Sequence, residues 1–260
     1  MRKLRAVLVI TWSTLQEALR NRLLVVAIFF ALLLTMLSVA AASVSFSEQA
    51  RLIIDVGLAS ASIVGSLTMV ALAVVSFARE IREHTAYPWL ARPYPRWVFV
   101  AGKFMGVTAA MQILLLLMHG ATAAAVLLQG SSLPGAFGIS VLLSSLEITV
   151  VAALALLFST LATPVLAASY SVGFLVIGNF TSDVQVFVKK LSETHAGLAR
   201  LLEIVQYVLP DLAAFSARTQ AANDLIVPGR FVLYATGYAL SYAGVSLLLA
   251  MFIFERRKTV

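Results

Sequence analysis

The chain has 260 residues, of which 61% are hydrophobic and only 12% are charged, and its mean hydropathy is +0.96. A soluble domain carries about 25% charged residues, so the composition excludes an ordinary soluble protein and predicts an integral membrane protein. The net charge of +7 reflects basic residues that flank apolar segments, and without aromatic-basic surface motifs it does not predict nucleic-acid binding. The absence of cysteine excludes disulfides, thiolate metal sites and cysteine nucleophiles.

Residues 1–22 predict an amphipathic helix, because apolar residues recur every three or four positions and basic residues stand at both ends. We expect this helix to lie in the cytoplasmic membrane interface, with Trp12 at the level of the lipid headgroups and Glu17 and Arg20 near its end. Packing of the helix on the transmembrane bundle is an equal alternative, and both can hold together. The charged residues that interrupt its short apolar run favour a retained segment over a cleaved signal peptide.

Six later segments approach the roughly 20 apolar residues that a membrane-spanning helix needs. The predicted spans are residues 23–44, 56–78, 98–128, 137–162, 164–180 and 231–254. The fold class predicted is therefore an all-α integral membrane protein, with one transmembrane domain over residues 1–260. Most Lys and Arg residues fall on one side if both termini are cytoplasmic, which predicts that orientation in a bacterial inner membrane.

Residues 79–97 form a charged, proline-punctuated island between the second and third spans. This many charges cannot lie in a bilayer, so the island is predicted to be a cytoplasmic loop. Its prolines limit backbone freedom, which suits a stiff surface that docks on a soluble partner. The alternative is a solvated loop whose aromatic residues only contact the membrane interface.

The longest hydrophilic stretch, residues 182–229, precedes the sixth span. Helical spacing of apolar residues in its first part predicts one or two amphipathic helices on the outer face of the membrane. The remainder, from Asp211 to Arg230, is expected to be a short cap, and an extracytoplasmic partner could dock on this side.

Two titratable residues lie deep in predicted spans: Glu147 near the middle of the fourth and His119 in the third. A charge at that depth costs about 2.5 to 3.5 kcal/mol, so Glu147 needs a partner, a hydrated cavity or a proton. It could line a translocation path, or it could hydrogen-bond to Ser144, Ser145 or Thr149 and fix helix packing. His119 could pair with Glu147 or be a packing residue.

The sequence contains no constellation for catalysis or for cofactor binding. Gly102-Lys103 lacks the upstream glycine and the following Ser or Thr of a phosphate-binding loop, and GxSxG and HExxH motifs are absent. One His and one Glu are too few for a metal site. We therefore expect no enzyme activity, bound cofactor or metal in this chain alone.

Several short motifs, in order along the six predicted spans, resemble the ABC-2 type permeases, the membrane subunits of a large class of ABC transporters. In the island these are Arg79-Glu80-Ile81-Arg82-Glu83, His84-Thr85, Tyr87-Pro88-Trp89-Leu90-Ala91, Arg92-Pro93 and Arg96, followed by Gly102-Lys103. Elsewhere they are Glu17 with Leu19-Arg20-Asn21-Arg22, Phe158-Ser159-Thr160-Leu161 with Pro164, and Leu209-Pro210-Asp211. The chain looks most similar to the permeases of nitrous-oxide-reductase maturation and gliding-motility systems, although its inner turn lacks charge.

The resemblance implies a homodimer of this chain in the membrane, with two soluble ABC ATPase subunits that bind ATP and Mg beneath it. It implies that residues 80–92 form a coupling helix docked in the ATPase. The docking residues it implies are Glu80, Arg82, Glu83, Thr85, Tyr87, Trp89 and Arg92.

Three functions follow as hypotheses. The first is the permease subunit of an ABC transporter, with export as the expected direction. The second is an ATPase-coupled subunit that relays mechanical work to an envelope machine without transport. The third is an intramembrane proton-linked protein that uses Glu147 and His119. The scarcity of polar groups in the spans predicts a hydrophobic or amphipathic cargo.

Overall fold

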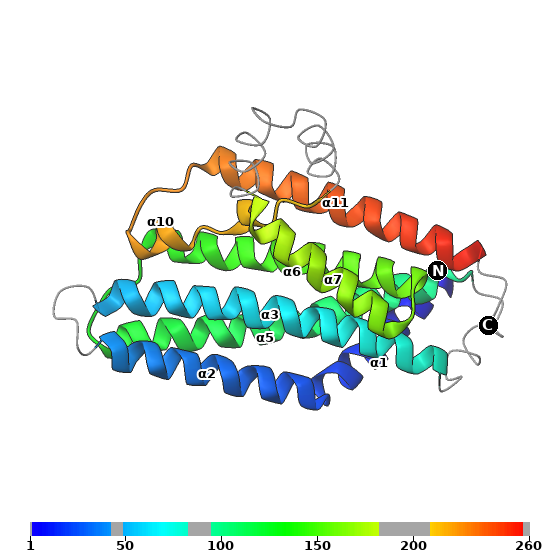
Figure 1. Cartoon of the computed structure of the whole chain (residues 1–260), viewed down its shortest axis with the longest axis horizontal. Helices are drawn as coiled ribbons and strands as arrows, with labels where there is room; N and C mark the ends of the chain where they lie inside the picture. Colours follow the sequence, from blue (N-terminus) through cyan, green and yellow to red (C-terminus); the bar gives the residue numbers. More distant parts are fainter. Residues whose placement is uncertain (1, 43–48, 83–94, 182–208, 257–260) are drawn as a thin grey trace, which may run out of the picture.

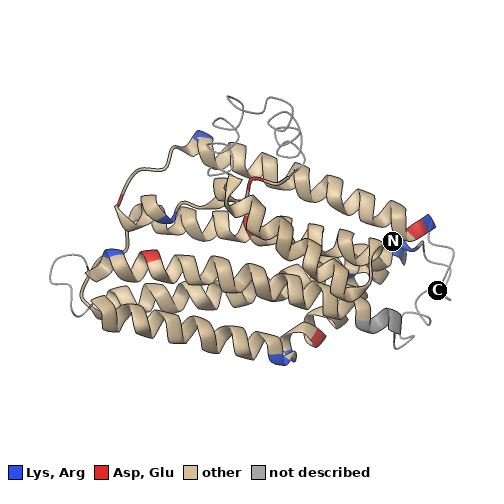
Figure 2. Cartoon of the chain, viewed as in Figure 1, with Lys and Arg blue, Asp and Glu red and all other residues tan. Residues whose placement is uncertain are grey.

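The computed structural model describes residues 2–42, 49–82, 95–181 and 209–256, and the described part is all-helical. Its elements are α1 (Arg2–Leu19), α2 (Arg22–Ala42), α3 (Gln49–Arg82), α5 (Trp97–Leu128), α6 (Gly135–Leu161), α7 (Pro164–Asn179), η1 (Ala213–Phe215), α10 (Arg218–Ala222) and α11 (Gly229–Arg256). The long helices lie side by side along one axis (Figure 1). Charged residues gather mostly near the two ends of this bundle (Figure 2).

Five of the described helices are long and apolar enough to cross a membrane: α2, α3, α5, α6 and α11. The chain is therefore a multi-pass membrane protein. The predicted fifth span corresponds to α7, which has 16 residues. At 1.5 Å per residue this helix is about 24 Å long, short of the roughly 30 Å hydrocarbon core. Six spans thus remain a prediction.

The two ends of the bundle differ in what they hold (Figure 1). At one end, which we call the terminus end, lie the start of α1, the end of α3, the start of α5 and the end of α11. The opposite end, the α10 end, holds the start of α3, the end of α5, α10 and the start of α11. The predicted cytoplasmic segments therefore share one end, as a bundle with both termini on the same side requires.

The helix that contains the second span extends beyond the predicted bounds of that span in both directions. Helix α3 begins at Gln49 rather than at residue 56, so Arg51 and Asp55 lie within it instead of flanking it. It continues to Arg82, so the first residues of the predicted loop 79–97 are helical. No proline interrupts the chain before Pro88, and the helix can extend past its apolar section.

Helix α1 packs along α5 rather than only resting at the membrane surface. Two glycines one turn apart, Gly102 and Gly106, bring the helices close: a Cβ at Gly102 would lie 2.7 Å from Ile10 Cβ, and one at Gly106 would lie 2.6 Å from Thr14 Cβ. Small residues that let two backbones approach are typical of helix packing in membranes.

The packed face of α1 is not the face that its leucines suggest. Its buried residues are mainly small or β-branched: Ala6, Val7, Ile10, Thr14 and Ala18. Its large apolar residues are exposed: Leu4, Leu8, Trp12 and Leu19. The two alternatives for this segment are compatible, because one face binds the bundle while the other offers apolar side chains to lipid.

Aromatic packing joins three helices at the terminus end. Phe77 of α3, Phe99 of α5 and Phe254 of α11 have ring centroids 5.6 to 5.9 Å apart. All three side chains are buried. This cluster fixes α3 and α5 next to the segment that connects them.

After residue 208 the described chain returns to the end of α7 and packs into the bundle. The Leu212 N–H donates to the carbonyl of Gly178 at 3.0 Å, and Leu212 and Phe215 are buried. The Asp211 N–H donates to the Tyr238 hydroxyl of α11 at 2.9 Å. The start of the expected short cap, residues 209–217, is therefore a segment inserted into the bundle, which we call the inserted segment. The amphipathic helices predicted before it lie outside the described residues.

Candidate functional site

A cavity of about 450 Å³ lies between α3, α6, α7 and the inserted segment with η1 and α10. It is partly open and mostly apolar in its walls, to which Leu58, Ile63, Leu175, Phe180 and Phe215 contribute. Its polar lining includes Ser62, Ser140, Ser144, Glu147 and Asn179. Non-helical backbone at membrane depth is tolerated where it is buried in protein or lines a cavity, and the inserted segment does both.

Glu147 lies at the inner end of the cavity with 3% of its surface exposed. Its carboxylate accepts hydrogen bonds from the Ser62 hydroxyl at 2.8 and 3.1 Å, and from the Ser66 hydroxyl at 3.1 Å. Ser62 and Ser66 are four residues apart on α3, so both face the same side of that helix. A buried carboxyl is thus held by hydroxyl donors from a neighbouring helix.

The predicted partners of Glu147 are wrong. Ser145 and Thr149 belong to another face of α6, where Gln112 of α5 donates to the Ser145 carbonyl at 3.1 Å. Ser144 donates to the backbone of Ser140 at 2.9 Å and lines the cavity, but it does not bind the carboxylate. In a helix, residues two positions from Glu147, such as Ser145 and Thr149, point away from the face that meets α3.

His119 does not pair with Glu147. Its Nδ1 lies 2.8 Å from the Leu115 carbonyl, and its ring packs against Phe137 with centroids 6.3 Å apart. Its Nε2 has no hydrogen-bond partner among the described residues. The structure therefore supports the packing alternative for His119, and the His119–Glu147 pair of the proton-linked hypothesis is not formed.

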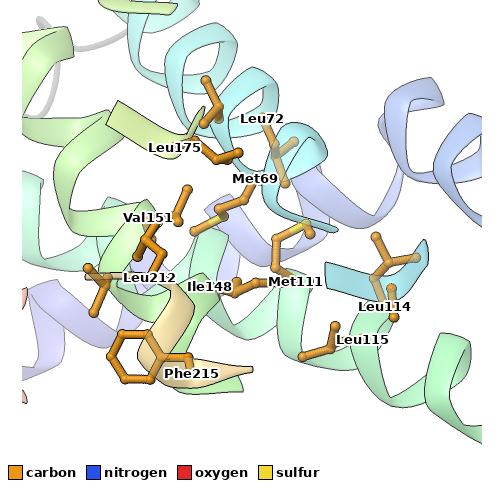
Figure 3. Close-up of a cluster of buried hydrophobic side chains, with 14 of the residues drawn as sticks. Met69, Leu72, Met111, Leu114, Leu115, Ile148, Val151, Leu175, Leu212 and Phe215 are labelled. Atoms are coloured by element: carbon orange, nitrogen blue, oxygen red, sulfur yellow. The ribbon is translucent and has the colours of Figure 1, made fainter. Parts of the chain in front are cut away.

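An apolar layer separates Glu147 from the terminus end. Met69 and Leu72 lie one and two turns beyond Ser66 on α3, and Val151 lies one turn beyond Glu147 on α6. With Met111 of α5 these side chains meet in the centre of the bundle (Figure 3), and each is at most 4% exposed. The polar cavity thus ends at Glu147.

The other end of the cavity carries an ion pair. The Arg218 Nε of α10 lies 3.5 Å from a carboxylate oxygen of Asp55 on α3, and both side chains are about half exposed. An exposed pair of this kind contributes about 0 to 1 kcal/mol, so it orients α10 more than it stabilises the fold. It also neutralises the arginine that lines the cavity.

A second buried charge lies near the terminus end. Lys103 is fully buried, and its Nζ lies 3.2 Å from a carboxylate oxygen of Glu17 and 3.1 Å from the Ser76 hydroxyl. The pair joins α1 to α5, and Ser76 adds α3. Sequence motifs include both Glu17 and Lys103 but do not pair them, although a lysine inside a predicted span requires a nearby acid.

The remaining predicted interfacial residues are at the surface. Trp12 is 61% exposed, and Arg20 is exposed at the end of α1. Asn21 then caps α2 by accepting the Leu23 N–H at 3.0 Å, which separates the two helices. Glu17 is not purely interfacial, because it turns inward to Lys103.

The predicted ATPase-docking residues cannot be placed. Glu80 and Arg82 are in the helical backbone of α3, but their side chains are not described. The others lie outside the described residues: Glu83, Thr85, Tyr87, Trp89 and Arg92. Their role stays a prediction.

The described residues contain no group of three His, Asp or Glu side chains that could hold a metal ion. Serines 62 and 66 are the functional residues that sequence reasoning missed. Their signal was present, since two hydroxyls one turn apart in a predicted span suit a buried carboxyl on a neighbouring helix.

Comparison with known proteins gives no match among family models and none among curated proteins, so the resemblance to ABC-2 type permeases depends on the sequence motifs alone.

Proposed function

We propose that this chain is the membrane permease subunit of an ABC transporter, driven by a separate ATPase, and that it exports a small amphipathic substrate. The observation that carries the proposal is the cavity of about 450 Å³ that reaches the buried Glu147 and is also lined by Arg218 of α10. An ionisable side chain at membrane depth that faces a cavity is typical of a transport pathway.

The broken structure around the cavity supports the same function. Helix α7 ends at Asn179, and the inserted segment continues beside it with irregular backbone before α10 begins. In many transporters, discontinuous helices near the bilayer midplane form the substrate site because their free backbone groups can bind polar ligands. The apolar layer beyond Glu147 matches a pathway that is open toward one side only.

The arrangement of the terminus end is consistent with coupling to a soluble ATPase. The end of α3 and the start of α5 lie there, held together by the Phe77–Phe99–Phe254 cluster. Force applied to the segment between these helices would pass into α3 and α5. Helix α3 carries Ser62 and Ser66, which donate hydrogen bonds to Glu147. Docking through Tyr87 and Trp89 remains a proposal from the sequence.

Co-purification tests the proposal. The full chain is extracted in detergent with candidate ATPases encoded near its gene, as wild type, as Tyr87→Ala with Trp89→Ala, and as a control with Phe231→Ala and Tyr234→Ala. The control also removes two aromatic residues, but near the start of α11 at the opposite end. We expect an ATPase to stay with the wild type and the control and to leave the loop variant.

Retention of the ATPase by the loop variant would contradict the docking proposal, and absence of any bound ATPase would contradict the permease proposal. Transport is then separated from mechanical relay by Glu147→Gln in the reconstituted complex. If the variant complex still assembles but loses ATP-driven efflux, the result supports transport. If the complex shows no efflux and the variant still supports its envelope process fully, the result supports mechanical relay.

A further inference from the structure

We propose that the cavity at Glu147 binds an organic cation with a primary ammonium group and a small apolar body. That such a cation is the transported cargo rests on the proposed function. That the cavity binds it does not. The site is built from α3, α6, α7 and the inserted segment, all within the described residues.

The hydrogen bonds that already exist leave acceptors facing the cavity. A hydroxyl has a single proton, and Ser62 donates its proton to Glu147, while Ser144 donates to the Ser140 carbonyl at 2.9 Å. Ser140 donates to backbone carbonyls, those of Ala136 and Ala217, both at 3.1 Å. These three hydroxyls can therefore only accept from a ligand.

The charge of the lining favours a cation. Glu147 supplies a carboxylate, and Arg218 is the only basic residue among the described lining residues. Because Arg218 is paired with Asp55 at the mouth, its charge is already balanced. An ammonium group offers three donors and no acceptor, which matches a carboxylate surrounded by hydroxyl acceptors. The Glu147 carboxylate would instead repel an anion, which also offers mainly hydrogen-bond acceptors.

The size and the apolar walls of the cavity fit a small apolar body attached to the ammonium group of the ligand. Ligand pockets of about 300 to 1,000 Å³ are typically apolar, with a few polar groups that fix orientation. This cavity has about 450 Å³ and side chains such as Leu58, Ile63 and Phe215 in its wall. A metal ion is a poorer fit, since the described lining residues supply one carboxylate and no histidine.

Binding to the purified full chain in lipid nanodiscs tests the inference without any ATPase. The probe is 2-phenylethylammonium, measured by equilibrium dialysis against empty nanodiscs, and its neutral counterpart is 2-phenylethanol. We expect the ammonium to bind at least about tenfold more tightly than the alcohol, because only the ammonium pairs with the carboxylate.

Three variants locate the site. Glu147→Gln keeps the shape of the side chain and should weaken binding of the ammonium at least about tenfold. Ala59→Leu fills the cavity without changing its charge and should also abolish binding, so the test survives if the first variant does not fold. Glu255→Gln makes the same chemical change at the exposed end of α11 and should bind as the wild type does.

Equal binding of the ammonium and the alcohol, or unchanged ammonium binding in both folded cavity variants, would overturn the inference. If the chain binds the ammonium as predicted but holds no ATPase, the site stands and the permease proposal falls. If an ATPase copurifies through the loop but no cavity-dependent ammonium binding occurs, the permease proposal stands and this inference falls.

Discussion

At the scale of single residues, the described part of the interior contains two charged side chains in separate places, each with partners from another helix. Glu147 is held by serines of α3, and Lys103 is held by Glu17 of α1 and Ser76 of α3. The sequence indicates that such residues need partners, because an unpaired charge in an apolar interior is costly. It does not identify the partners, since these lie 27 to 86 residues away along the chain.

Removing the buried lysine tests the pair that Lys103 forms with Glu17. Lys103→Met should lower the free energy of unfolding by about 2 kcal/mol, because Glu17 is left without its partner but remains one-third exposed to solvent. Denaturant titration of the purified chain measures the loss. The double variant with Glu17→Gln should recover part of it, and a double variant as unstable as the sum of the two single variants would show that the residues do not interact.

Two serines of α3 provide a matched test at Glu147. Ser66 is fully buried and donates to the carboxylate, so Ser66→Ala should cost about 1 to 2 kcal/mol of stability. Ser60 is also buried but donates only to the Gly57 carbonyl of its own helix. Ser60→Ala should cost less than about 1 kcal/mol. Equal losses in thermal unfolding of the two variants would argue against a special role of the Ser66 hydroxyl.

At the scale of elements, apolar length predicts the helices well and fails where other forces decide their ends. The predicted spans 98–128 and 137–162 differ from α5 and α6 by at most two residues at each end. The start of α3 was missed because Arg51 and Asp55 look like flanking charges, yet Asp55 pairs with Arg218 of α10. The sequence does not predict which face of α1 packs on α5, because small and β-branched residues, and not the leucines, make that contact.

The contact between α1 and α5 predicts opposite effects for two glycines on one helix. A methyl group at Gly106 would meet Thr14 and the backbone of α1, so Gly106→Ala should destabilise the chain by about 1 to 3 kcal/mol. Gly120 has open space around it, so Gly120→Ala should be neutral or stabilise by up to about 1 kcal/mol. Thermal unfolding in one detergent compares them, and equal shifts would mean that α1 does not pack as described.

At the scale of the whole molecule, the bundle has the Glu147 cavity toward one end and the connection between α3 and α5 at the other. Composition and charge distribution predict a multi-pass bundle with the charged segments on a common side. They do not predict the cavity, because it depends on where the segment after residue 208 enters the bundle. That entry follows from backbone contacts such as Leu212 N–H to Gly178, which leave no pattern in the sequence.

The predicted orientation can be tested with thiol labelling, since the chain has no native cysteine. Ile226 is 94% exposed near the α10 end, and Glu255 is exposed at the terminus end. With both termini cytoplasmic, Ile226→Cys should react with a membrane-impermeant maleimide in intact cells. Glu255→Cys should react only after permeabilisation, and the reverse pattern would invert the orientation.

The ion pair between α1 and α5 also has a consequence for biogenesis. Glu17 is synthesised before Lys103, so its carboxylate can already be at the membrane when α5 is inserted. A lone lysine costs about 2.5 to 3.5 kcal/mol at the centre of an inserting helix, and Lys103, near the start of α5, would cost less than that. Because α1 is synthesised before α5, Glu17 would offer Lys103 an acidic partner while α5 inserts into the membrane.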